Sequence, residues 1–181
     1  ILKYWLVDDL GTHRDEMTLK LLQKAGKYNR WVYEMLRPWI GRDILEVGSG
    51  IGNMTRYFLG HGRVTASDVS PFYLRELKRA FADYDTVKVR PLDISTNSYA
   101  EVELYDTIVC LNVLEHIEDD VQALRNMRTL LKPGGRLILY VPANQRLYCE
   151  IDRGVGHYRR YDREQLVSRM RCAGFRVGHS R

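Results

Sequence analysis

Cysteine is scarce in this chain of 181 residues, and long apolar runs are missing from it. Its three cysteines, Cys110, Cys149 and Cys172, are far apart and show neither paired nor metal-type spacing, which argues against a disulfide framework and a zinc site. No apolar stretch approaches the roughly 18 residues of a membrane-spanning helix, and the N-terminus lacks a short apolar core with basic flanks. We therefore expect a cytoplasmic protein with no membrane span, and we predict no metal site.

The excess of positive over negative charge is also small, since 28 Lys and Arg residues against 23 Asp and Glu residues give a net charge of +5. This balance favours an acidic partner only weakly, because a charge of that size is ordinary for solubility. With 45% hydrophobic residues the chain can build one substantial core, so we expect a single domain over residues 1–181. The chain begins at Ile1 rather than at a methionine and ends soon after an expected strand, so we expect a trimmed protein.

A turn of alternating glycines follows a short apolar run and is the most informative segment. Residues 43–54 read Asp-Ile-Leu-Glu-Val-Gly-Ser-Gly-Ile-Gly-Asn-Met, which predicts a strand, a tight turn and the start of a helix. Three glycines that lack Cβ atoms let the backbone bend sharply and let a ligand lie against peptide groups. The segment therefore predicts a site for a cofactor that carries an adenosine.

The glycine spacing separates two kinds of cofactor. A dinucleotide fingerprint needs a glycine at its sixth position, where this chain has Asn53, and Glu46 would put a carboxylate close to the pyrophosphate. A cationic ligand suits that carboxylate better. The segment resembles the first motif of the class I S-adenosylmethionine-dependent methyltransferases, in which the acid faces the methionine end and the glycine turn passes under it.

Expected strands and helices alternate along the rest of the chain, after a helical region from about residue 14 to 39 that Gly26 interrupts. This alternation predicts an α/β fold, a doubly wound and mainly parallel sheet with helices on both faces. Strands are expected at 44–47, 63–67, 86–90, 105–111, 136–141 and 175–178, and helices at 53–59, 71–82, 119–131 and 162–173.

Polar residues follow the expected strands, and ligands bind outside the carboxyl ends of strands in such sheets. Asp68 is placed to accept both ribose hydroxyls, although it could instead cap the next helix. Asp93 can accept from an adenine amino group, with a turn-forming role as the alternative, and Asn112 is placed to meet the sulfonium end. The predicted cofactor residues are Glu46, Gly48, Ser49, Gly50, Asn53, Asp68, Val69, Asp93, Ile94 and Asn112.

The resemblance extends through successive family motifs between about residues 44 and 141. They read Glu-Val-Gly-Ser-Gly-Ile-Gly, Ala-Ser-Asp-Val-Ser, Pro-Leu-Asp-Ile, Asn-Val-Leu-Glu-His-Ile and Leu-Lys-Pro-Gly-Gly-Arg-Leu-Ile-Leu. This order implies a Rossmann-like methyltransferase fold, with S-adenosylmethionine as donor and S-adenosylhomocysteine as product. Asn-Val-Leu-Glu-His-Ile is similar to the ubiquinone-biosynthesis-like, type 11 small-molecule branch. Residues 156–161 and 28–31 look like bacterial methyltransferases found beside or fused to glycosyltransferases.

The family's sheet usually ends in an antiparallel hairpin, and only its first member, around Phe175, is expected here. We therefore expect the C-terminal strand to be missing. Within the single domain we predict an N-terminal helical lid or extension at 1–40, a cofactor-binding core at 41–142, and an acceptor-side loop, helix and incomplete hairpin at 143–181. Tyr28 and Trp31 belong either to that lid or to the core face of the leading helix.

A loop expected from Pro142 to Tyr161 is a candidate acceptor-binding segment, because structureless loops of this length are uncommon in compact domains. Its arginines and tyrosines could grip an anionic or ring-containing group. His116 and His157 are the candidate bases for an acceptor that must lose a proton, and either could instead be structural. We expect a small-molecule acceptor, such as a glycan, a lipid-linked group or a quinone-like ring.

Three other functions remain open. The chain could be a non-catalytic cofactor-binding module of a larger protein, or a nicotinamide-dependent oxidoreductase, which the glycine spacing disfavours. The arginines between Arg153 and Arg181 motivate nucleic-acid methylation. The chain lacks the Asn/Asp-Pro-Pro-aromatic motif that looks typical of amino-group nucleic-acid methyltransferases, so we expect no nucleic-acid partner.

Overall fold

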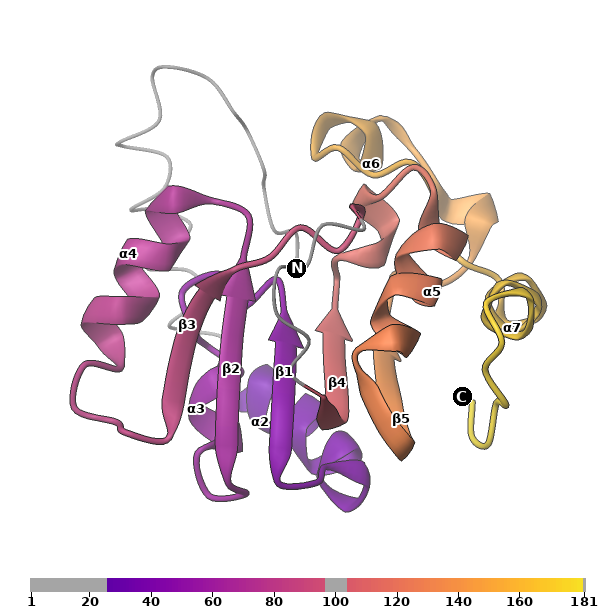
Figure 1. Cartoon of the computed structure of the whole chain (residues 1–181). Coiled ribbons are helices and arrows are strands. Elements are labelled where there is room, and N and C mark those ends of the chain that lie inside the picture. The colour runs from indigo at the N-terminus through magenta and orange to yellow at the C-terminus, as the bar shows by residue number, and fades with distance from the viewer. Residues whose placement is uncertain (1–25, 97–103, 181) are drawn as a thin grey trace.

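A computed structural model of the chain describes residues 26–96 and 104–180. Within them, strands in the order β3-β2-β1-β4-β5 form one sheet in which all neighbours run parallel (Figure 1). The predicted α/β fold with a parallel sheet is therefore confirmed. The strands are β1 (Asp43–Val47), β2 (Arg63–Asp68), β3 (Val87–Pro91), β4 (Tyr105–Leu111) and β5 (Leu131–Tyr140).

Helices cover both faces of the sheet because successive side chains of each buried strand point to opposite sides. In β1, Ile44 packs with Val32 and Phe58 on one face, whereas Leu45 belongs to the core cluster that contains Leu124 on the other. The α-helices are α2 (Gly26–Leu36), α3 (Thr55–Phe58), α4 (Pro71–Ala80), α5 (Asp120–Thr129), α6 (Glu150–Gly154) and α7 (Arg163–Cys172). Short 3-10 helices are η1 (Arg37–Trp39), η2 (Leu114–His116) and η3 (Gln145–Leu147).

The strand order reverses between β1 and β4. The chain passes from β1 outward through β2 and β3, then returns so that β4 pairs with the other edge of β1, with Val47 opposite Cys110. Loops that leave β1 and β4 at their carboxyl ends therefore diverge from the same place. Open parallel sheets bind ligands at such a switch point.

The strand expected at 136–141 begins earlier than predicted, because Pro133-Gly134-Gly135 lie inside β5, which starts at Leu131. Leu131 pairs with Tyr105 and Arg136 with Thr107, so the segment between forms an irregularity in the strand. A Cβ on Gly135 would lie 2.9 Å from the Lys132 carbonyl oxygen. The glycines therefore let the strand bulge without ending it.

The end of the chain differs from expectation in two places. The segment 142–161, expected to be a loop, contains η3 and α6. Residues 175–180 form no strand, so the strand expected at 175–178 is wrong. The helix expected at 162–173 is confirmed as α7, which ends at Cys172, and Gly174 follows it as a left-handed residue with a φ of +87°.

Residues 14–25 of the helical region expected from residue 14 to 39 lie outside the described residues. The remainder forms α2 and η1. Tyr28 donates a hydrogen bond from its hydroxyl to that of Tyr140 at 2.9 Å and packs against the core, whereas Trp31 is 55% exposed. Burial, and then the Tyr140 hydroxyl, raise the pKa of Tyr28. Tyr28 thus belongs to the core face, and the boundaries at 40 and 142 stay predictions.

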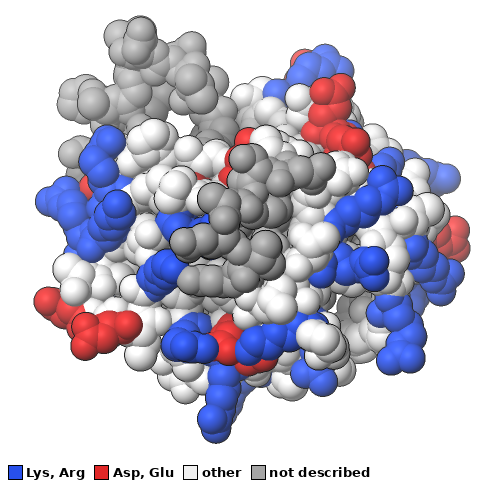
Figure 2. Space-filling model, in the orientation of Figure 1, with Lys and Arg blue, Asp and Glu red and all other residues white. Residues whose placement is uncertain are grey.

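Among residues 26–96 and 104–180, no helix combines the length and the apolar character that crossing a bilayer requires. On the face shown in Figure 2, lysines and arginines lie in several separate groups among neutral and acidic residues. Nucleic-acid-binding proteins usually gather such charge into one patch or stripe. The described part of this face therefore gives no support to the nucleic-acid alternative.

Candidate functional site

The glycine turn lies at the carboxyl end of β1 and adopts a left-handed backbone. Gly48 has a φ of +70°, and a Cβ there would lie 2.3 Å from Cγ2 of Val113 in the loop after β4. Gly52 has a φ of +79°, and a Cβ there would lie 2.4 Å from the Phe81 ring. Both positions therefore require glycine. In the dinucleotide fingerprint, the glycine at the sixth position allows close packing of the helix against its neighbours. Here the closely packed glycine is Gly52, one residue before that position.

Hydrogen bonds join this turn to the end of β2. The Ser49 N–H donates to the Ser67 carbonyl at 2.8 Å, and the Ser67 hydroxyl donates to the Glu46 carbonyl at 2.8 Å. The Gly50 N–H donates to Oδ2 of Asp68 at 2.9 Å. Bonds from buried groups therefore hold the backbone of the turn in this conformation.

Two predicted cofactor residues have structural partners of their own. Glu46 is buried, and the Thr55 hydroxyl at the start of α3 donates to its Oε2 at 2.5 Å. Asp68 is buried as well, and its Oδ1 accepts the Ser70 N–H at 2.9 Å just before α4. Asp68 therefore orders the turn before α4 and also fixes the glycine turn, but Ser70 is the N-cap residue, so the alternative interpretation of Asp68 as the helix cap is wrong. The contact of Asp68 with a ribose stays a prediction.

The Asp93 side chain forms a turn, because its Oδ1 accepts both the N–H and the hydroxyl of Ser95, at 2.9 and 2.6 Å. Ile94 is buried, and its carbonyl accepts from Nδ2 of Asn126 at 2.9 Å. The alternative interpretation, in which Asp93 forms a turn, is therefore confirmed. Contacts of Asp93 and Ile94 with an adenine stay predictions.

Asn112 follows β4 with a positive φ of 51°, and its N–H donates to the Tyr140 carbonyl at 2.7 Å. The next residue, Val113, lies against Gly48, so this loop meets the glycine turn at the switch point. Val69 is 56% exposed at the end of β2, and Asn53 is half-buried after the turn. All the predicted cofactor residues lie in or after the carboxyl ends of β1, β2, β3 and β4, with Glu46 inside β1 and Asp68 as the last residue of β2.

The two candidate bases, which are far apart in sequence, lie together. The rings of His116 in η2 and His157 after α6 have centroids 4.6 Å apart and meet edge to face. Nε2 of His157 lies 3.9 Å from Oε1 of Glu115, which is buried. The backbone holds the two segments together, since the Tyr158 N–H donates to the Glu115 carbonyl at 2.8 Å. The sequence identified each histidine but not their contact.

Asp152 was missed by the sequence analysis because it lies in a segment expected to be a loop. Its Oδ1 is 2.9 Å from Nδ1 of His157, and Nε of Arg160 donates to both of its oxygens at 2.9 Å. Burial favours the protonated acid, but Arg160, the Cys149 N–H and His157 outweigh it and lower the pKa of Asp152 to about 2. The sequence signal that could have identified Asp152 is its position three residues after Cys149, where an acidic side chain can cap the start of a helix.

Arg159 and Arg160, which were predicted to bind an anionic acceptor, instead pair with carboxylates of the protein itself. Arg159 lies 3.1 Å from Oδ2 of the buried Asp120, which also accepts from Arg169 at 2.6 Å and from the Tyr161 hydroxyl at 2.9 Å. Burial, and then the charge of Asp120, raise the pKa of Tyr161. These side chains tie the segment to α5 and α7. Asp120 is a second residue that the sequence analysis missed.

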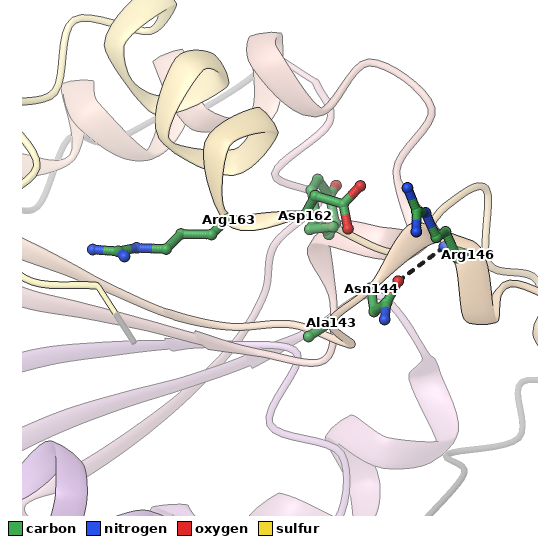
Figure 3. Close-up of a pocket in the computed structure, with 6 residues that line it drawn as sticks. Ala143, Asn144, Arg146, Asp162 and Arg163 are labelled. Atoms are coloured by element: carbon green, nitrogen blue, oxygen red, sulfur yellow. Dashed lines mark hydrogen bonds between the residues drawn. The ribbon is translucent and has the colours of Figure 1, made fainter.

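A hollow of about 450 Å³ lies beside the start of this segment (Figure 3). The Arg146 N–H donates to Oδ1 of Asn144 at 3.1 Å within it. Its lining residues are Ala143, Asn144, Arg146, Tyr161, Asp162 and Arg163. None of them is a predicted cofactor residue, so the hollow does not mark the glycine turn.

Comparison with known proteins adds a family to this geometry. The sequence profile described as "Methyltransferase domain" matches residues 45–137, which run from β1 into β5. Prosolanapyrone synthase of Alternaria solani is 36% identical over 108 residues, 53% of this chain and 4% of that protein. Methyltransferase calH of Penicillium decumbens is 34% identical over 107 residues, 52% of this chain and 29% of that protein.

A crystal structure of the trans-methyltransferase CalH in complex with SAH superposes with a TM-score of 0.60. The aligned residues are 29% identical and cover 86% of this chain and 48% of that one. The chain thus spans well under half the length of the curated relatives described above, 4% and 29% of them.

Proposed function

Because this chain belongs to the methyltransferase domain family, we propose that it transfers a methyl group from S-adenosylmethionine to a small-molecule acceptor. The observation that carries the proposal is the glycine turn at the switch point, with the Gly50 N–H bound to Asp68. S-adenosylmethionine, when bound, supplies an electrophilic methyl group and leaves as S-adenosylhomocysteine with the electron pair of the broken carbon–sulfur bond.

The residues present fit such a cofactor. Gly48 and Gly52 let the turn pack closely against Val113 and Phe81, and the carboxylates of Glu46 and Asp68 suit a ligand with a positive charge and ribose hydroxyls. We assign the ribose to Asp68, the adenine to Asp93 and Ile94, and the methionine end to Glu46 and Asn112. Backbone around Gly48, Ser49 and Gly50 lies under the cofactor, with Asn53 and Val69 at its border.

The acceptor side is assigned to the loop after β4, where Glu115, His116 and His157 meet. The new bond uses a lone pair of the acceptor, so a hydroxyl or protonated amine must also lose a proton, whereas a carboxylate only needs to be positioned. His116 and His157 are the residues we propose for proton removal, directly or through another group that they hold. Alignment within about 3 to 3.5 Å and exclusion of water are the remaining tasks of the protein.

For the methyl acceptor we propose several classes of small molecule and no single compound. Relatives named as polyketide synthases add a polyketide-like acceptor to the glycan, lipid-linked and quinone-like groups that the sequence suggests. An association with glycosyltransferase-type proteins stays a proposal that rests on residues 28–31 and 156–161 alone.

Titration calorimetry with S-adenosylmethionine and S-adenosylhomocysteine tests the cofactor site. We expect Asp68→Asn to weaken binding at least 10-fold, because an amide keeps the shape of the side chain but loses the charge and one acceptor. Asp83→Asn, at an exposed position after α4, is the control and should bind as the wild type does. Circular dichroism of both variants shows whether the fold is kept.

Methyl transfer is tested with a labelled methyl donor and a panel of hydroxyl, amine and carboxylate acceptors. Cofactor binding without transfer to any acceptor would favour the non-catalytic module. Binding of a nicotinamide dinucleotide in place of S-adenosylmethionine would overturn the proposal.

A further inference from the structure

A cluster of three potential metal ligands lies among the described residues beside the proposed acceptor site. Glu115, His116 and His157 each offer one ligand atom, and these three atoms lie within 4.8 Å of one another. Glu115 is buried and both histidines are half-buried, so the cluster is sheltered from bulk water. Two imidazole nitrogens and one carboxylate oxygen form a donor set typical of catalytic zinc sites.

The ring of His157 is held by a carboxylate on the side away from the cluster. Nδ1 lies 2.9 Å from Oδ1 of Asp152, which is fully buried and is itself fixed by Arg160 and by the Cys149 N–H. Histidines that bind metals usually give their second nitrogen to a carboxylate in this way, which fixes the tautomer and the direction of the ring. Nε2 of His157 is thereby directed toward Glu115, at 3.9 Å from its Oε1.

The spacing between the atoms suits a shared ion better than a direct contact. At 3.9 Å, Nε2 of His157 and Oε1 of Glu115 are too far apart for a hydrogen bond. Donor atoms bound at about 2.0 to 2.2 Å from a tetrahedral zinc ion lie about 3.4 Å apart, so the 3.9 Å pair closes with a shift of about half an ångström and atoms at the 4.8 Å limit with a shift of about 1.4 Å. Backbone contacts already join the two segments, because the Glu115 carbonyl accepts from Tyr158 and the His157 carbonyl accepts from the Tyr148 hydroxyl.

We propose that Glu115, His116 and His157 bind one divalent zinc-class ion, which departs from the sequence-based expectation of no metal site. Imidazole nitrogens favour zinc and similar transition metals over magnesium, which prefers oxygen ligands. Three protein ligands leave a position for an exchangeable water or an acceptor oxygen. The cluster follows Val113, which touches Gly48, so the ion site adjoins the cofactor turn.

Resting on the proposed function, the ion site also specifies the acceptor as a hydroxyl compound. An acceptor oxygen at the exchangeable position loses its proton more readily, because the cation stabilises the oxyanion. The proton passes to solvent, and the oxygen lone pair then forms the new bond to the methyl carbon. Both histidines act as ligands in this arrangement and need not take the proton themselves.

Zinc binding to the full chain tests the site without any activity assay. The protein is stripped with a chelator, dialysed and titrated with zinc by calorimetry, and bound metal is counted by mass spectrometry. We expect one tightly bound ion per chain, and binding at least 100-fold weaker in Glu115→Gln and His157→Gln. Glu118→Gln and His179→Gln, at exposed positions, are matched controls that should bind as the wild type does.

A structural role for the cluster predicts different results. Equal zinc affinity in the wild type and the Glu115→Gln variant, or no tight ion in the wild type, would overturn the metal site. If the variants fail to fold by circular dichroism, X-ray absorption of the zinc-loaded wild type decides, because two imidazoles and one carboxylate must surround the ion. Any other ligand set overturns the proposal.

The two proposals fail separately. Cofactor titration of the metal-stripped protein tests the methyltransferase function, since the glycine turn does not need the ion. Transfer to hydroxyl acceptors should fall at least 10-fold on stripping and return with zinc. Transfer that is unchanged in stripped protein would overturn the hydroxyl assignment and leave the proposed function intact.

Discussion

At the scale of the residue, single side chains in this protein serve the fold and the proposed site together. Asp68 holds the N–H of Gly50 with one oxygen and the N–H of Ser70 with the other. A carboxylate oxygen accepts more than one hydrogen bond, so these contacts leave room for a ribose. Asp68 thus orders the backbone before α4 without being its N-cap residue, which is Ser70, and its proposed contact with a ribose does not compete with these bonds.

Gly48→Ala is expected to be among the most damaging small changes near the site. Its φ of +70° disfavours any side chain, and the new methyl group would meet Val113 at 2.3 Å. We expect the free energy of unfolding to fall by about 2 to 4 kcal/mol, from backbone strain and overpacking together. Urea unfolding measures the change. Gly60→Ala, where nothing lies within 4 Å, is the control, and an equal loss there would contradict the argument.

At the scale of the element, buried carboxylates decide how the segment after β5 packs. Asp120, at the start of α5, is 1% exposed and receives Arg159, Arg169 and the Tyr161 hydroxyl. Asp152, in α6, receives hydrogen bonds from Arg160 and lies in hydrogen-bond contact with His157, both of which follow that helix. Charge and hydrogen bonds thereby join α7 to α5 and α6 to the residues that follow it.

Asp120→Asn should loosen α7. The amide keeps the side-chain shape but leaves Arg159 and Arg169 without their buried counter-charge, and we expect a loss of about 2 kcal/mol in the free energy of unfolding. Asp119→Asn is the control, because Asp119 caps α5 and asparagine caps a helix equally well. Hydrogen exchange should show faster exchange across α7 in Asp120→Asn alone. Unchanged protection of α7 would mean that apolar contacts hold it.

At the scale of the whole molecule, the two ends of the sheet carry different tasks. The predicted cofactor residues lie in or after the carboxyl ends of the strands. At the opposite end, Lys132 in β5 bonds to Asp43 in β1 and lies 2.9 Å from Oδ1 of Asp106 in β4. This ionic contact joins three strands where no ligand is expected.

Lys132→Met should change the acid sensitivity of the fold. Hydrogen bonds from Lys132, then from Arg63, lower the pKa of Asp43, and Lys132, then the Asp43 N–H, lower the pKa of Asp106, from an ordinary value of 3.8. Depressed pKa values give stability that is present above pH 3.8 and is lost as the pH falls below it. We therefore expect the urea midpoint to fall less between pH 6 and pH 3 in the variant than in the wild type.

Lys78→Met, on the exposed face of α4, is the control for that measurement and should keep the wild-type pH dependence. Cofactor affinity should be unchanged in Lys132→Met, because the contact lies at the far end of the sheet from the glycine turn. Weakened cofactor binding in this variant would show that the two ends are coupled.

Local patterns explain why much of the fold could be read from the sequence. The short apolar runs of β1 and β4, which are buried almost throughout, and the left-handed glycines of the turn depend on neighbours in the chain, so β1 to β5, the sheet class and the turn were predicted and found. The late start predicted for β5, at residue 136 instead of Leu131, has the opposite cause. Pro133-Gly134-Gly135 are unfavourable in a regular strand, but pairing of Leu131 with Tyr105 and of Arg136 with Thr107 carries the strand across them.

The sequence by itself determined the alternating fold, the glycine turn and the individual candidates Glu46, Asp68, His116 and His157. Only the tertiary structure decided that His116 and His157 meet, that Glu115 and Asp152 flank them, and that Arg159 and Arg160 bind internal carboxylates. The physical reason is range. Propensity and periodicity act over a few residues, whereas a cluster of buried polar groups forms only when the sheet brings distant segments together and each charge must find a partner.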